Sequence, residues 1–167
     1  MNTEKNSIGQ VAFIAGLFTF LGMVLYFILM KFAGFVHIPE LRFLNVLIAA
    51  AGGVGAIKYY NNQSQKHIKY LTGLSVSFIT IIIGSVLFAA FVFSYFKFAD
   101  PELLNAIRVD TPVMGINITP LTAAISVVAE GLVSGLLISF IAMQYYKDDT
   151  LHAPYKSMSG QLRTEED

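Results

Sequence analysis

Cysteine and tryptophan are both absent from this sequence of 167 residues. Without a thiol, the chain cannot form a disulfide, use a cysteine nucleophile or bind a metal ion through sulfur. Charged residues are scarce as well, at 13% of the sequence, whereas an average soluble domain has about 25%. Basic and acidic residues number 11 each, so the net charge is zero and the sequence does not indicate the basic surface that nucleic-acid binding requires.

Apolar residues, in contrast, are abundant: they make up 55% of the sequence, and the mean hydropathy is +0.63. They are concentrated in long runs between clusters of charge. A helix needs about 20 mostly apolar residues to cross a bilayer core of about 30 Å. Four segments reach that length, namely residues 11–30, 39–60, 71–95 and 121–145.

None of these four segments has a polar stripe along one side. In a soluble protein such helices must be covered on every side, and a chain of 167 residues cannot cover four of them. The sequence therefore predicts an all-α integral membrane protein, with a bundle of four transmembrane helices in residues 1–146. Residues 147–167 are expected to form a flexible polar tail, because they have too little apolar content to fold alone.

Prolines mark the expected starts of the second and fourth helices. Pro39 suits the first helical position, and Glu40 beside it favours the positive end of the helix dipole. Thr119 and Pro120 form a similar start, with the threonine as N-cap.

The two helical hairpins resemble each other weakly. Each first helix is followed by Lys-Phe-Ala, and each second helix begins at a proline and ends near a tyrosine pair. These matches are consistent with an ancient duplication of one hairpin in parallel topology. Chance similarity between apolar segments is the alternative.

Positive charge is distributed unevenly between the two sides of the membrane. Seven of the 11 lysine and arginine residues lie in the N-terminus, the loop between the second and third helices and the tail, and four lie in the other two loops. The positive-inside rule then predicts that both termini are cytoplasmic.

Small residues recur four apart in two of the predicted helices. Gly131 and Gly135 form a GxxxG pattern in the fourth, and Ala51 and Gly55 form a similar pattern in the second. Such patterns let another helix backbone approach closely. The partner is either a neighbouring helix of the same bundle or a second copy of the chain.

Glu130 is the one charged residue that interrupts the apolar run of the fourth helix. A charged carboxylate at bilayer depth costs about 2.5–3.5 kcal/mol on insertion scales, so we expect Glu130 to face the bundle interior as a neutral acid that donates a hydrogen bond. The candidate partners in the outer half are Tyr26, Asn45 and Tyr95. Arg42 above them is the competing partner, which would keep the carboxylate ionised.

The sequence contains no nucleotide-binding loop, no Ser/His/Asp set and no paired carboxylates, and its three histidines are not at metal-ligand spacing. We therefore expect neither an enzyme nor a bound metal or cofactor.

Three short motifs carry a resemblance to a known group. They read Gly55-Ala-Ile-Lys-Tyr-Tyr60, Phe98-Ala-Asp-Pro-Glu102 and Glu130-Gly-Leu-Val-Ser134. With the four spans, they resemble a family of four-helix bacterial inner-membrane proteins, common in Bacteroidetes and classed as a domain of unknown function. The resemblance implies a multi-pass protein of the bacterial cytoplasmic membrane and adds no chemistry.

These observations favour a non-enzymatic membrane protein that acts as an accessory, scaffold or assembly partner. It would contact the lipid bilayer and belong to a homo-oligomer or a larger membrane complex. The rival hypothesis is an oligomeric transporter, or an ion- or proton-handling protein, that uses Glu130. Four helices are few for a self-contained secondary transporter, so this alternative requires a second copy or a partner.

Overall fold

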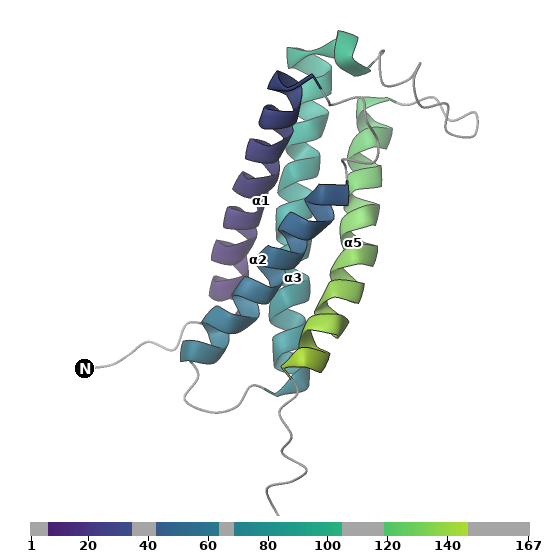
Figure 1. The fold of residues 1–167 in the computed structure, drawn as a ribbon. Coiled ribbons are helices and arrows are strands. Elements are labelled where there is room, and N and C mark those ends of the chain that lie inside the picture. The colour runs from purple at the N-terminus through teal and green to yellow at the C-terminus, as the bar shows by residue number, and fades with distance from the viewer. Residues whose placement is uncertain (1–6, 35–42, 64–68, 105–118, 147–167) are drawn as a thin grey trace, which may run out of the picture.

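The computed structural model describes residues 7–34, 43–63, 69–104 and 119–146, which are helical and contain no strand. Four of the helices are long and apolar enough to cross a membrane, which confirms the predicted all-α membrane fold (Figure 1). The elements in chain order are α1 (Ile8–Phe32), α2 (Phe43–Gln63), α3 (Tyr70–Ser94), the π-helical turn η2 (Tyr95–Ala99) and α5 (Pro120–Tyr145).

The helix boundaries agree with the predicted spans to within a few residues. Thr119 caps α5 as expected: its Oγ1 accepts a hydrogen bond from the Thr122 N–H at 3.1 Å, and Pro120 is the first helical residue. The predicted start of the second helix at Pro39 and the tail at residues 147–167 both lie outside the described residues.

Helix α3 is the centre of the bundle. Half of its most apolar stretch is buried, against 22–28% for the other three spans. It lies behind α2, between α1 and α5, and packs against all three (Figure 1). The buried face of α3 is rich in glycine and hydroxyl residues, which let three neighbours approach its backbone. Those residues are Gly73, Ser77, Thr80, Gly84 and Ser85.

Helices α1, α2 and α3 meet closely around Thr19. The Thr19 hydroxyl donates a hydrogen bond of 2.8 Å to the Ala15 carbonyl oxygen, which orients the side chain. A Cβ atom added to Gly52 would lie 2.0 Å from Thr19 Oγ1, and one added to Gly84 would lie 3.1 Å from Thr19 Cγ2. Thr19 therefore fills a space that two bare glycine backbones leave for it.

Large apolar side chains are exposed around the outside of the bundle. Phe18, Leu71 and Ile141 each expose more than 70% of their surface. In water such a surface would promote aggregation, whereas in a bilayer it contacts lipid tails. The exposed faces are thus consistent with four helices that cross a membrane.

Candidate functional site

Glu130 lies near the middle of α5, about 15 Å below the first residue of the helix by helical rise. Its side chain is half-buried. Its backbone carbonyl accepts a hydrogen bond of 2.6 Å from the Ser134 hydroxyl. Within the described residues, no polar group lies within hydrogen-bond or ion-pair distance of the Glu130 carboxyl group.

Two of the candidate partners, Tyr95 and Asn45, are not hydrogen-bonded to Glu130. Tyr95 contacts Lys31 instead, and the side-chain oxygen of Asn45 is buried without a hydrogen-bond partner among the described residues. Tyr26 is half-buried on α1, which packs on α2 and α3 rather than on α5. Arg42 lies outside the described residues.

The chemistry available at Glu130 follows from its depth. A carboxyl group at mid-span is costly to place in hydrocarbon, and membrane proteins usually pair such a group or use it to bind a proton or an ion. The basic side chains of the described residues lie at or near the helix ends, at Lys31, Lys58, Lys69 and Lys97. A basic partner at the depth of Glu130 would therefore come from outside the described residues.

The predicted packing glycines of α5 contact α3 of the same chain. A Cβ atom added to Gly131 would lie 2.2 Å from Ser85 Oγ and 2.4 Å from Ser85 Cβ. One added to Gly135 would lie 3.0 Å from Ile81 Cγ2. The GxxxG pattern in α5 thus serves packing within the bundle.

The predicted packing residues of α2 behave differently. Ala51 is exposed, and a Cβ atom added to Gly55 would have no other atom within 4 Å. Gly53 contacts α3 in their place, since its added Cβ atom would lie 2.6 Å from Ser77 Oγ. Within the described chain, the Ala51–Gly55 side of α2 therefore has no helix packed against it.

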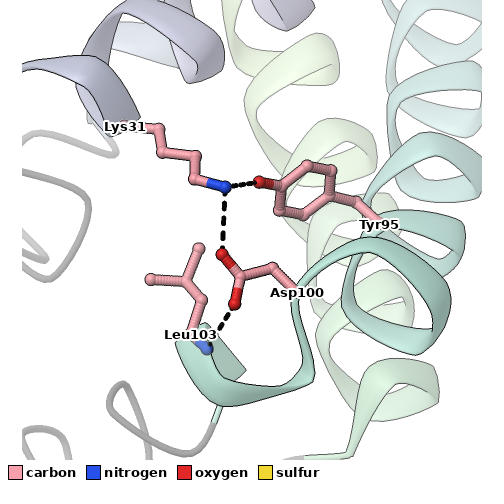
Figure 2. A network of polar contacts seen from close by, with 4 residues as sticks. All are labelled: Lys31, Tyr95, Asp100 and Leu103. Carbon is pink, nitrogen blue, oxygen red and sulfur yellow. Dashed lines mark hydrogen bonds and ion pairs between the residues drawn. The ribbon is translucent and has the colours of Figure 1, made fainter.

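A polar network that the sequence reasoning missed joins the ends of α1 and α3 (Figure 2). Lys31 Nζ donates a hydrogen bond to Tyr95 Oη and lies 2.9 Å from Asp100 Oδ2. The other carboxylate oxygen of Asp100 accepts a hydrogen bond of 3.0 Å from the Leu103 N–H. Tyr95 is the first residue of the turn η2 and Asp100 directly follows the turn. Both side chains reach the Lys31 ammonium group. The sequence Asp100-Pro101 was the available signal, because it is typical of a helix start.

These contacts affect the charge of Asp100. The Lys31 ammonium, and to a lesser extent the Leu103 N–H, lower the pKa of the Asp100 carboxyl below its ordinary value. Because the pKa is lower in the folded protein than in the unfolded chain, the pair stabilises the fold at neutral pH. This contribution is lost as the pH falls through the lowered pKa.

We expect Asp100→Asn to reduce the thermal stability in detergent slightly at pH 7. Asparagine keeps an oxygen that accepts the hydrogen bond from the Leu103 N–H, but it has no charge to pair with Lys31. The effect is small because an ion pair as exposed as Lys31–Asp100 contributes little to stability. The difference in melting temperature between the two proteins should vanish at acid pH, where the parent carboxylate is also neutral. A difference that persists unchanged at low pH would contradict this assignment.

Comparison with known proteins identifies a family but no activity. The model of the family described as "Protein of unknown function (DUF4199)" matches residues 10–111. The match covers more than half of the chain and includes most of α1 and all of α2, α3 and η2, whereas α5 with Glu130 lies beyond it. No curated protein and no solved structure matches the chain. The resemblance to an uncharacterised family is confirmed, and the chain belongs to the DUF4199 family of proteins of unknown function.

Proposed function

We propose that the protein is a non-enzymatic membrane protein that acts as an accessory, scaffold or assembly partner of other membrane components. The observation that supports this proposal is the Glu130 carboxyl group, which is half-buried at mid-span and has no polar partner in the described chain. An unpaired carboxyl at this depth favours association, since a hydrogen-bonding group from another helix relieves its desolvation.

The alternative is a proton- or cation-handling role of an oligomer. The same carboxyl group supports it, because a proton or a cation can also neutralise the charge at this depth. The two functions differ in what Glu130 must be able to do. Assembly requires a hydrogen-bonding or charged group, whereas proton handling requires a group that exchanges a proton.

Purification in mild detergent, followed by measurement of the mass of the particle, tests the proposal. We expect the parent protein to run as an oligomer or with stoichiometric partner proteins. Glu130→Leu should release the partner while the helical content is retained. A monomeric parent without partners would contradict the proposal.

Glu130→Gln separates the two functions, because glutamine keeps the shape and most hydrogen bonds but cannot exchange a proton. Retained assembly and phenotype with glutamine, combined with loss in Glu130→Leu, supports assembly. Normal assembly with a lost phenotype supports proton or cation handling.

We propose that the protein resides in the bacterial inner membrane with both termini in the cytoplasm. The distribution of lysine and arginine supports this orientation. Reporter fusions at Lys5, Ser64, Ala106 and Gly160 should report inside, inside, outside and inside. An external signal from Gly160 would overturn the topology.

A further inference from the structure

We propose that the side of α5 that carries Glu130 binds a transmembrane helix of another protein, and that this helix presents a lysine, arginine or histidine at the depth of Glu130. This inference rests on the proposed function and adds the chemistry of the partner. Its basis is the depth and burial of Glu130 and the absence of a charge partner for it among the described residues.

The position of Glu130 on α5 makes it accessible to a partner. Gly131, the next residue, is buried against Ser85 of α3. Glu130 therefore lies about 100° around α5 from the side that contacts α3 most closely. It shares an edge of α5 with Ala123 and Val127, which pack against the core cluster that includes Ala49 of α2. Glu130 is therefore half-buried at the border of the bundle and can be reached from the bilayer.

Charge complementarity favours a basic partner over a second copy of this chain. The described spans carry a carboxyl group at mid-depth, and their lysines lie at or near the helix ends. The described residues of a second copy would thus bring another Glu130, hydroxyl groups or apolar side chains to this depth, but no basic group. A foreign helix with a mid-span basic group removes the desolvation cost of both groups at once, because each supplies the partner that the other lacks.

The probe is a synthetic Leu/Ala transmembrane helix with one central lysine, compared with the same helix with a central leucine. The full-length protein and the labelled helix are reconstituted in phosphatidylcholine vesicles, and association is measured by energy transfer. We expect the lysine helix to bind the parent about tenfold more strongly than the leucine helix, as an intramembrane polar contact provides.

Two variants test whether Glu130 and its position are responsible. Glu130→Leu should abolish the preference for lysine, and it is expected to fold because the rest of α5 is apolar. The double variant Glu130→Leu/Leu132→Glu moves the carboxyl two residues along α5, to a position that is 44% exposed on another side of the helix. We expect no recovery of the preference in this variant.

Three results would overturn the proposal: no preference for lysine in the parent, a preference that survives in Glu130→Leu, or one that Leu132→Glu restores. Self-association of the parent that depends on Glu130, without any effect of the lysine helix, would identify a second copy as the occupant. That result would overturn this inference and leave the proposed assembly function intact. A parent that purifies as a monomer without partners is the separate result that contradicts the proposed function.

Discussion

Gly131→Ala is expected to destabilise the folded bundle by about 1–3 kcal/mol, the usual range for overpacking a tight core. The added methyl group would lie 2.2 Å from Ser85 Oγ and 2.4 Å from Ser85 Cβ. Rotation of the serine side chain moves the hydroxyl oxygen but cannot move Cβ, because Cβ is attached to the α3 backbone. The two helices must therefore separate, and this strains the largest helix–helix contact in the bundle.

Ser85→Gly provides the matched rescue. It removes both atoms that the alanine methyl group would meet, so the double variant Gly131→Ala/Ser85→Gly should recover most of the lost stability. Gly55→Ala is the control for helix propensity, because its methyl group enters open space and alanine favours a helix by up to about 1 kcal/mol over glycine. The free energy of unfolding is measured by denaturant titration in mild detergent. Equal stability of Gly131→Ala and Gly55→Ala would refute the packing of α5 on α3.

The membrane spans were predictable because hydropathy is a local property of the chain. Long apolar runs without a polar stripe predict a spanning helix whatever surrounds them, and α1, α3 and α5 begin and end within a few residues of the expected positions. The N-cap at Thr119 was equally predictable, since a threonine followed by proline encodes a helix start within two residues.

The packing side of α2 could not be read from the sequence alone. Residues 49–56 contain mainly alanine and glycine, so small residues four apart occur in several overlapping frames. We predicted that Ala51 and Gly55 pack against another helix. In the structure, Ala49 and Gly53 face the core instead. The rotation of α2 decides between them, and it depends on Ser77 and Ile81 of α3, which are distant in the sequence.

The polar network of Lys31, Tyr95 and Asp100 was missed for a similar reason. The predicted orientation placed Tyr95 and Glu130 in the outer halves of their helices, so Tyr95 was among the expected partners of Glu130. Tyr95 lies instead on the side of α3 that faces α1, where it contacts Phe27 and Lys31, and η2 changes the helical repeat only after it. A hydropathy pattern shows neither which side of α3 faces α1 nor where a π-helical turn forms, so the shared contact of Tyr95 and Asp100 with Lys31 could not be derived from it.

Gly52→Ala is expected to destabilise the contact between α1 and α2 by about 1–3 kcal/mol. The new methyl group would lie 2.0 Å from Thr19 Oγ1 and 3.0 Å from Thr19 Cβ. The threonine cannot turn away at no cost, since its hydroxyl is bonded to the Ala15 carbonyl oxygen and its methyl group already lies against Gly84.

A double-mutant cycle with Thr19→Ala distinguishes this clash from a general effect on α2. Thr19→Ala removes Oγ1 and Cγ2 and leaves only Cβ, at 3.0 Å from the added methyl group, which a shift of a few tenths of an ångström accommodates. Gly52→Ala should therefore cost much less in the Thr19→Ala background, with a coupling free energy of about 0.5–3 kcal/mol, as residues in direct contact show. Gly55→Ala in the same helix should show no coupling to Thr19. Additive effects of Gly52→Ala and Thr19→Ala would mean that α2 is rotated differently in the membrane, with Gly52 turned away from α1.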